Sequence, residues 1–341
     1  MIKEAIVALA GGRSLSNTEA VQVMEEIMEG KATPAQLGAF LTALSMKGET
    51  AEEIAGLALV MREKAIQVKA AGPVLDIVGT GGDGLNTFNI STAAALVAAA
   101  SGVRVAKHGN RAATSQCGSA DVLEKLGVRI DLTAEGVREC LQQVGLGFMF
   151  APAFHPSMKY AAGPRREIGI RTVFNILGPL TNPAHAEYQV IGVPSPGLAE
   201  KIVPALIKLG TSHALVVHGL NGMDEISISG GSLIWEVEDG RVTSSRRSLS
   251  PEDFGLTRAA DGFIGGGTPE ENARTILRVL SGARGPQRDI VVLNAAAALV
   301  AGNLVETFRQ GAELAQTTLD KGLALAKLQQ LIKFTGQLAG N

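Results

Sequence analysis

The sequence of 341 residues contains only two cysteines, one tryptophan and two tyrosines, and its formal net charge is −2. Cys117 and Cys140 are too few for a disulfide framework or a cysteine zinc site. The nearly balanced charge lacks the basic excess that is typical of a protein that binds nucleic acid or an acidic membrane surface. We therefore expect neither nucleic acid nor a membrane as a partner.

Long hydrophobic runs are also missing. The longest apolar stretches, near Ala93–Ala100 and Ile290–Ala301, are too short or too interrupted to span a bilayer, so we expect buried helices there. Residues 1–4 include an acidic residue and do not resemble the start of a secretory signal. With 46% apolar and 19% charged residues, the composition is typical of a soluble globular protein. We expect a cytoplasmic location.

Two glycine-containing segments each join an apolar, strand-like run to a helix-like run. Residues 76–92 read DIVGTGGDGLNTFNIST, and residues 105–121 read VAKHGNRAATSQCGSAD. Glycine lets successive backbone N–H groups converge on an anion, and a following helix adds the positive end of its dipole. Both segments also carry hydroxyl and amide side chains: Thr87, Asn89, Ser91, Thr92, Thr114, Ser115 and Ser119. Two such segments in succession predict a substrate with phosphates at both ends.

The first glycine segment also satisfies the dinucleotide fingerprint G-x-G-x-x-G, with Gly79, Gly81 and Gly84. A dehydrogenase would need an acidic residue about 20 positions later, where it binds a ribose hydroxyl. The next strand-like run ends instead in Lys107-His108, a basic pair that leaves only NADP open. The hydroxyl-rich continuation favours a second anion site over NADP. A Walker A loop is excluded, because no Lys-Ser/Thr pair follows the last glycine.

After Pro73, short runs rich in valine and isoleucine alternate with alanine-rich, helix-like stretches. The strand-like runs are Val74–Val78, Val103–Ala106, Phe148–Phe150, Val190–Val193 and Ala214–Val217. This alternation predicts an α/β fold, with a central, mostly parallel sheet flanked by helices. In such sheets ligands bind beyond the carboxyl ends of the strands, where both glycine segments lie. Residues 225–237 predict a further strand, a turn at Gly230-Gly231 and a second strand.

Residues 1–72 predict a small all-α domain that precedes an α/β domain at residues 73–341. Three capping-box patterns stand before runs with apolar residues at helical spacing: Ser16 with Glu19, Thr33 with Gln36, and Thr50 with Glu53. Thr268 with Glu271 predicts the start of another helix in the α/β domain. The apolar surface of the small domain is typical of a core, although part of it would also suit a dimer face.

An adjacent pair of carboxylates, Asp224-Glu225, follows the strand-like run 213–218 and a glycine-containing turn. Mg²⁺ prefers oxygen ligands and usually keeps substrate phosphates and water in its shell. An Asp-Glu pair alone is more often a solvated turn. Beside a predicted polyphosphate site, however, the pair predicts magnesium binding.

Residues 151–172 combine prolines, aromatic residues and three arginines directly after a strand-like run. Arg165 or Arg166 is suited to bind a ligand carboxylate, and three rings are suited to enclose an aromatic ligand: Phe154, His155 and Tyr160. The arginines could equally pair with Glu167 or with helix carboxyl ends. Residues 175–183, NILGPLTNP, predict a rigid loop or hinge.

These motifs, in this order, closely resemble those of the anthranilate phosphoribosyltransferase family of tryptophan biosynthesis. The matching segments are residues 79–83, 86–92, 107–111, 118–121, 165–166, 175–183 and 224–225. The resemblance covers essentially the whole chain. It implies a small helical domain joined to a larger α/β domain, a homodimer formed through the helical domain, and a return of about residues 165–184 to that domain or to the hinge.

The reaction that the resemblance implies joins anthranilate to phosphoribosyl pyrophosphate, giving N-(5′-phosphoribosyl)anthranilate and diphosphate, with Mg²⁺. Residues implied to bind phosphoribosyl pyrophosphate are Gly79, Gly82, Asp83, Thr87, Asn89, Ile90, Ser91, Thr92, Lys107, His108, Gly109, Asn110, Arg111, Ala112, Ala113, Thr114, Ser115 and Ser119. Those implied to bind metal are Ser91, Asp224 and Glu225. Gly79, Asn110 and Arg165 would contact anthranilate, with Arg165 on its carboxylate and with His108 and His155 nearby. An aromatic amine needs little activation, so no dedicated catalytic base is expected.

Three positions depart from the family's usual pattern: Ala112, Ala113 and Gln116. Relatives often carry hydroxyl or basic side chains at the first and third of these positions and a larger residue at the second, so side-chain contacts there are in doubt. Two other functions stay open. A pyrimidine nucleoside phosphorylase shares the broad architecture, and a DNA-binding paralogue keeps the fold without the transfer activity. Arg165 and the Lys107–Asn110 segment favour the transferase over the first, and the near-neutral charge argues against the second.

Overall fold

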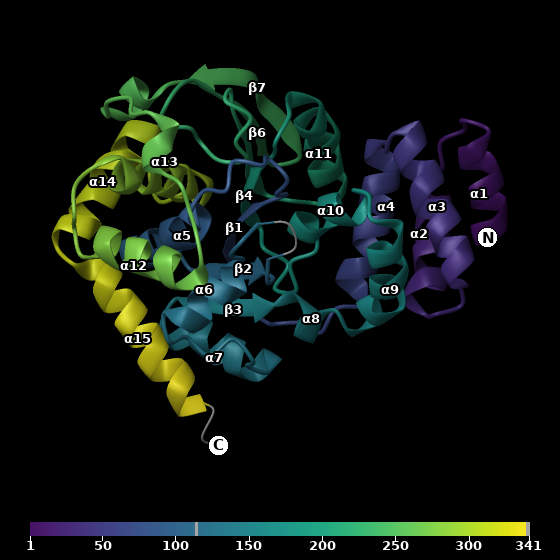
Figure 1. The fold of residues 1–341 in the computed structure, drawn as a ribbon, viewed down its shortest axis with the longest axis horizontal. Helices are drawn as coiled ribbons and strands as arrows, with labels where there is room; N and C mark the ends of the chain where they lie inside the picture. The colour runs from purple at the N-terminus through teal and green to yellow at the C-terminus, as the bar shows by residue number, and fades with distance from the viewer. Residues whose placement is uncertain (113–114, 339–341) are drawn as a thin grey trace.

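The computed structural model describes residues 1–112 and 115–338. Figure 1 shows a helical part at the N-terminal end, drawn in purple, beside a larger part built around a sheet. The expected fold class, a small helical domain with an α/β domain, is confirmed.

The helical part begins with four elements in chain order: α1 (Ile2–Ala10), α2 (Asn17–Met28), α3 (Pro34–Lys47) and α4 (Ala51–Glu63). The three predicted capping boxes are confirmed, because Ser16, Thr33 and Thr50 accept backbone hydrogen bonds from the residues three positions later, whose side chains bond back. The capping box at Thr268 is confirmed as well. The apolar faces of the helices pack together in a core that includes Met24, Ile27, Leu41 and Leu44.

The described residues form one seven-stranded sheet in the order β3-β2-β1-β4-β5-β6-β7. Its strands are β1 (Leu75–Gly79), β2 (Val105–Gly109), β3 (Leu146–Phe150), β4 (Tyr188–Gly192), β5 (His213–Gly219), β6 (Ser232–Glu238) and β7 (Arg241–Leu249). The pairs from β3 to β5 are parallel, whereas β6 and β7 are added antiparallel. The five predicted parallel strands are therefore present, each within a few residues of its expected range.

Helices cover both faces of the sheet. Helices α5 (Ile90–Ser101) and α13 (Pro286–Ala301) pack against each other and against β1 on one face, at the left of Figure 1. Helix α11 (Pro196–Lys208) covers the other face and packs against α4 of the helical part. Side chains of a strand alternate between its two faces. Accordingly, Leu215 and Val217 of β5 pack in the core beneath α5 and α13, whereas Ala214 and Val216 pack in the core shared with α11 and the helical part. Helices α5 and α13 are the two buried helices that were expected.

The chain between β3 and β4 returns to the helical part. It contains α8 (Ala151–Phe154), the 3₁₀ turn η1 (Pro156–Met158), α9 (Lys159–Ile168), α10 (Phe174–Leu177) and the 3₁₀ turn η2 (Gly178–Leu180). Helix α9 packs against α2 and α3, and α10 packs against α4. Residues 175–183, expected to be a rigid loop, thus consist largely of helical turns. The side chain of Asn175 accepts the Thr172 N–H at 3.0 Å and helps to start them.

The remaining described elements complete the α/β part: α6 (Ser119–Lys125), α7 (Ala134–Gln143), η3 (Pro251–Phe254), η4 (Asp261–Phe263), α12 (Pro269–Leu280), α14 (Phe308–Asp320) and α15 (Leu323–Leu338). The expected strand at 225–229 is wrong. This stretch instead lies in a turn, where Ser227 and Ser229 bond each other, and β6 pairs with β5 and β7. No helix among the described residues is long and apolar enough to cross a membrane.

Candidate active site

The carboxyl ends of β1 and β4 lie where the chain leaves the sheet in opposite directions. β1 continues through α5 to β2 on one side, whereas β4 continues through α11 to β5 on the other. In open α/β sheets, ligands bind in the crevice at such a point. The last residues of the two strands, Gly79 and Gly192, are direct neighbours in the sheet register. Both glycine segments and the Asp224-Glu225 pair extend from this edge.

Asp224 lies against both of these glycines. A Cβ atom on Gly79 would overlap the Asp224 carboxylate, and a Cβ atom on Gly192 would overlap the Asp224 carbonyl. The Asp224 carboxylate also accepts a hydrogen bond from the Gly81 N–H at 2.7 Å. Bare backbone at positions 79 and 192 therefore lets the Asp224-Glu225 pair approach the first glycine segment. Gly192 was missed in the sequence, because its importance depends on the pairing of β1 with β4.

The first glycine segment does not have the geometry of a dinucleotide loop. Gly81, Gly82 and Gly84 have φ angles of 66°, 81° and 74°, which favour glycine. Helix α5 begins only at Ile90, well beyond the last of these glycines. In the dinucleotide fold the glycine turn leads directly into the helix and places it on the pyrophosphate. The NADP alternative therefore has no support in the geometry.

Unpaired polar atoms beside this segment are available to bind a ligand. Among the residues that the structure describes, Thr80 Oγ1 and Thr92 Oγ1 are buried without a hydrogen-bond partner. Buried polar groups are normally paired, so orphans next to a glycine loop fit a polar ligand that would complete them. Thr92 was predicted as a ligand residue. Thr80 was not, although it stands within the same run of glycines.

Residues 264–272, which we call the strap, form hydrogen bonds with the first glycine segment. The Gly266 N–H donates to the Asn86 carbonyl at 2.7 Å, and the Phe88 N–H donates to the Ile264 carbonyl at 3.2 Å. Asn272 Nδ2 donates to Asn89 Oδ1 at 2.9 Å. The side chain of Asn89 is thus fixed from outside, and the strap is a part of the site that no sequence motif indicated.

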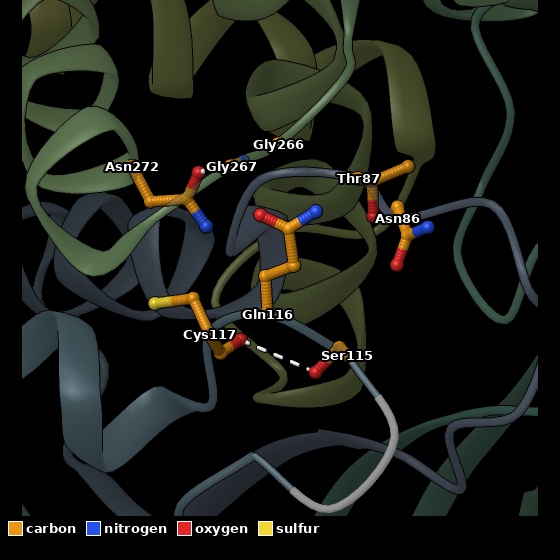
Figure 2. A pocket seen from close by; sticks show the side chains of 8 residues that line it. All are labelled: Asn86, Thr87, Ser115, Gln116, Cys117, Gly266, Gly267 and Asn272. Atoms are coloured by element: carbon orange, nitrogen blue, oxygen red, sulfur yellow. Dashed lines mark hydrogen bonds between the residues drawn. The ribbon is translucent and has the colours of Figure 1, made fainter.

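A small pocket separates the strap from the two glycine segments (Figure 2). It is lined by Asn86, Thr87, Ser115, Gln116, Cys117, Gly266, Gly267 and Asn272. In Figure 2 the side chain of Gln116 points into this pocket, between Asn272 and Thr87. Gln116 is one of the three departures from the family pattern. Its amide therefore faces the first glycine segment.

The second glycine segment is organised by Asp121 of α6. The Asp121 carboxylate accepts the N–H groups of Ala112 and Gly118, both at 2.9 Å. The Arg111 guanidinium pairs with Asp121 at 3.0 Å and also contacts Glu124. The Arg111 side chain is therefore engaged with two carboxylates of α6. Ala113 and Thr114, two further predicted residues, lie outside the described residues.

The start of the second segment is tightly packed. The Asn110 carbonyl accepts the Ser119 hydroxyl at 3.3 Å and the Ala120 N–H at 3.1 Å. A Cβ atom on Gly109 would overlap the Ser119 hydroxyl, and one on Gly118 would overlap the backbone at Arg111 and Ala112. Ser119 and Asn110 are thus brought together as predicted, and the Asn110 side chain is exposed.

Lys107 lies between the two glycine segments. Its ammonium group donates to the Ile77 carbonyl at 2.5 Å and to Ser91 Oγ at 3.3 Å. Burial lowers the pKa of Lys107, and the neighbouring Asp76 and Glu225 act in the opposite direction. Lys107 therefore brings a buried positive group to the place where the predicted phosphate and metal residues meet.

Asp76 was not predicted, although a carboxylate inside an apolar strand was a visible signal. It accepts Asn182 Nδ2 at 2.8 Å and the His108 N–H at 3.2 Å, and Asn182 also donates to the Ala106 carbonyl at 2.8 Å. Burial raises the pKa of Asp76 to about 6, against the influence of Lys107. These side-chain bonds join β1 and β2 beyond Leu75 and Val105, the one described pair in their register.

The carboxylates at this edge repel one another. Burial, with the nearby Asp224, raises the pKa of Glu225 to about 8, and burial with the nearby Asp83 raises that of Asp224 to about 6. Crowded carboxylates with raised pKa values fit a site for a divalent cation. The described residues contain no cluster of three or more His, Cys, Asp or Glu side chains arranged as metal ligands. Mg²⁺ sites commonly use one or two carboxylates with substrate phosphates and water.

Two buried histidines face each other behind the second segment. The rings of His108 and His155 lie 5.0 Å apart, and neither Nε2 atom has a hydrogen-bond partner in the described part of the chain. Burial lowers the pKa of His108 to about 3 and that of His155 to about 4. Both rings are therefore neutral near pH 7. Their free nitrogen atoms are available to a polar group of a ligand.

The other expected ring contacts differ from the prediction. Phe154 is fully buried in a core cluster, and Tyr160 packs against Gly30 of the helical part. Arg165 stacks on the Phe174 ring, 4.9 Å from its centroid, and burial lowers its pKa. No ion pair joins Arg165 or Arg166 to Glu167 among the described side chains.

Comparison with known proteins adds an independent finding. Family models described as "Glycosyl transferase family, helical bundle domain" and "Glycosyl transferase family, a/b domain" match residues 3–65 and 71–325. Anthranilate phosphoribosyltransferase of Dehalococcoides mccartyi is 61% identical over 339 residues, covering 99% of each chain. The Thermus thermophilus structure of that name has a TM-score of 0.92 and 45% identity, covering 97% of this chain and 99% of the other. The structure of the Saccharomyces cerevisiae protein of the same name, in complex with PRPP and Mg, has a TM-score of 0.91 and 30% identity, and the match covers 98% of each chain.

Proposed function

Because the chain belongs to the anthranilate phosphoribosyltransferase family, we propose that its two glycine segments bind phosphoribosyl pyrophosphate (PRPP) for transfer to anthranilate. The products are N-(5′-phosphoribosyl)anthranilate and diphosphate, and the reaction is the second step of tryptophan synthesis from chorismate. This proposal rests on one observation. Asp224 packs against the bare backbone of Gly79 and Gly192, which places the carboxylate pair beside the first glycine segment.

The site supports a substitution at C1 of the ribose. The amine of anthranilate forms a bond to C1 as the bond to diphosphate breaks, and negative charge grows on the departing diphosphate. Backbone N–H groups of the glycine segments and the Lys107 ammonium are preorganised for such charge. Because an aromatic amine is already nucleophilic, correct placement of the two substrates supplies most of the rate.

Anthranilate recognition falls to Arg165, Asn110 and the backbone at Gly79. The Arg165 guanidinium binds the carboxylate of anthranilate as a planar, bidentate donor. Neutral His108 and His155, which we also assign to this end of the site, offer free ring nitrogens without adding positive charge. The proposal assigns no strong base to the reaction.

Asp224, Glu225 and Ser91 are the residues that would hold Mg²⁺. When bound, Mg²⁺ would neutralise charge on the diphosphate and lower the barrier to its departure. The raised pKa values of the two carboxylates support this assignment, because a cation would relieve their mutual repulsion.

The chain organisation that we propose has a helical domain of residues 1–72, joined by about residues 165–184, and an α/β domain formed by the rest of 73–341. The packing of α9 on α2 and α3 supports this division. We further propose a cytoplasmic homodimer formed through the helical domain. Val7 and Met46 of α1 and α3 support that face, because their side chains are 74% and 84% exposed.

The decisive test is consumption of anthranilate. Purified protein with MgCl₂ and PRPP should deplete the fluorescence of anthranilate and release stoichiometric diphosphate, and omission of either PRPP or Mg²⁺ should abolish the change. Thymidine with phosphate, and duplex DNA in a mobility assay, serve as controls for the phosphorylase and DNA-binding functions. A protein that left anthranilate unchanged would rule out the proposed reaction.

A further inference from the structure

Arg171 reaches the first glycine segment from the connection between α9 and α10. Its Nη1 donates to the Gly81 carbonyl at 3.0 Å. The guanidinium also lies where a Cβ atom of Gly82 would be, so it contacts the bare backbone of that glycine. Gly82 therefore serves two purposes: it permits the positive φ of the turn, and it makes room for a cation beside the loop.

The charge of Arg171 is available, unlike that of the other cations at the two segments. Lys107 faces Asp76 and Glu225, and Arg111 pairs with two carboxylates of α6. Arg171 is exposed and forms no ion pair with any residue that the structure describes. A positive group beside a loop of backbone N–H donors, without an ion-pair partner in the described part of the chain, is an arrangement suited to a phosphate.

We propose that Arg171 is a binding residue for the diphosphate of PRPP and for the diphosphate product. This inference rests on the proposed function and adds a residue to the site. The guanidinium contacts Gly82, so a diphosphate bound beside this glycine would receive charge-assisted hydrogen bonds from Arg171. Those bonds strengthen as the bond to C1 breaks and charge collects on the leaving group, so Arg171 acts on binding and on the chemical step.

The same residue joins the helical part to the substrate loop. The carbonyl of Arg171 accepts a hydrogen bond from Ser45 Oγ of α3 at 3.3 Å, while its side chain contacts Gly81 and Gly82. Arg165, proposed for anthranilate, stands on the same connection between β3 and β4. Recognition of both substrates by arginines is thus carried by a segment that packs on the helical part.

The experiment compares Arg171→Gln, Arg171→Lys and a control, Arg241→Gln, which removes an exposed arginine from the edge strand β7. Titration calorimetry measures the affinity for inorganic diphosphate with Mg²⁺, and steady-state kinetics measure KM for each substrate. Arg171→Gln should weaken diphosphate binding and raise KM for PRPP by about 10- to 100-fold, with a smaller loss for lysine. The KM of Arg171→Gln for anthranilate should stay within about twofold of wild type, and so should every measured constant of the control variant.

A structural role would give a different pattern. Ser45→Ala removes the link to the Arg171 carbonyl but leaves the guanidinium, and it should not change diphosphate affinity. Wild-type affinity for diphosphate in Arg171→Gln would overturn the proposal; if that variant does not fold, wild-type affinity in Arg171→Lys would do so. Binding needs no turnover. The two proposals can therefore fail separately. If the wild type left anthranilate unchanged but bound diphosphate, and Arg171→Gln lost this binding, the transfer reaction would be refuted and the diphosphate contact would stand.

Discussion

Individual glycines of this site differ in what they do, and the sequence alone does not separate them. Gly79 and Gly82 were predicted from the loop motif, whereas Gly192 ends a strand and carries no motif. Its function follows from a neighbour far away in the chain, since β1 pairs with β4 and Asp224 covers both strand ends. Asn272 was missed for the same reason, because its partner Asn89 is set by the tertiary fold.

Gly192→Ala should therefore destabilise the protein and displace the carboxylate pair. Its Cβ would overlap the Asp224 backbone, and overpacking of this kind costs about 1–3 kcal/mol. Denaturant unfolding measures the change, and activity at limiting Mg²⁺ should fall. Gly197→Ala in α11 is the matched control, because nothing lies within 4 Å of the added Cβ. Equal stability of the two variants would contradict the proposed contact.

Glu225→Gln should change how stability depends on pH. The pKa of Glu225 is about 8 in the folded protein against an ordinary value of 4.5, so between about pH 4.5 and pH 8 the folded state keeps a proton that the unfolded state has lost. The free energy of unfolding of the wild type therefore falls as pH rises through this window. Glutamine cannot ionise. In urea unfolding with EDTA, the free energy of unfolding of the variant should therefore rise relative to that of the wild type from about pH 5 to pH 8. Parallel profiles would argue against a raised pKa.

Among the elements, those with a strong repeating pattern were predicted best. The parallel strands and the capped helices follow from apolar runs and capping boxes, which depend on local sequence. The edge strand β7 was not predicted, because eight of its nine residues are partly or fully exposed and apolar alternation is absent. The 225–229 stretch shows the opposite error: its isoleucines are buried in a turn beneath α13, where Asn294 bonds the Ile226 backbone.

Asp121 organises the second glycine segment as a local element, and Asp121→Ala should loosen it. The substitution removes the acceptor of two backbone N–H groups, at Ala112 and Gly118, with an expected loss of about 1–3 kcal/mol and weaker use of PRPP. Glu124→Ala, the control, removes only the second and more exposed partner of Arg111 and should cost less than about 1 kcal/mol. Thermal unfolding and KM for PRPP measure both variants. Similar losses in the two would show that the ion pair of Arg111, rather than the backbone hydrogen bonds of Asp121, stabilises the segment.

The whole molecule agrees with the architecture expected from the sequence, but the connection between its parts was not fully foreseen. One hydrophobic core runs from α2 and α4 through α11 to one face of β4 and β5. Periodicity identifies the apolar face of each helix, yet it does not say which faces meet. The return of about residues 165–184 to the helical domain or to the hinge was expected only from the family resemblance, because nothing in the composition of this segment specifies a partner.

The proposed dimer is a property of the whole molecule and is testable in solution. Val7→Lys with Met46→Lys places two charges on exposed apolar positions of the helical part and should convert a dimer to a monomer in sedimentation velocity. Leu304→Lys, at a half-exposed leucine of the α/β part, should leave the mass unchanged. A wild type that sediments as a monomer, or a double variant that stays dimeric, would contradict this face.

The contact of Asp224 with the bare backbone of Gly79 and Gly192 also limits how the enzyme can evolve. The position of that carboxylate is set by main-chain geometry, so substitutions of neighbouring side chains should hardly change it. The proposed anthranilate end is different, because the residues that we assign to it, His108, His155 and Arg165, would act through their side chains. We therefore expect directed evolution to broaden the range of anthranilate derivatives readily, while the demand for a phosphorylated ribose donor stays unchanged.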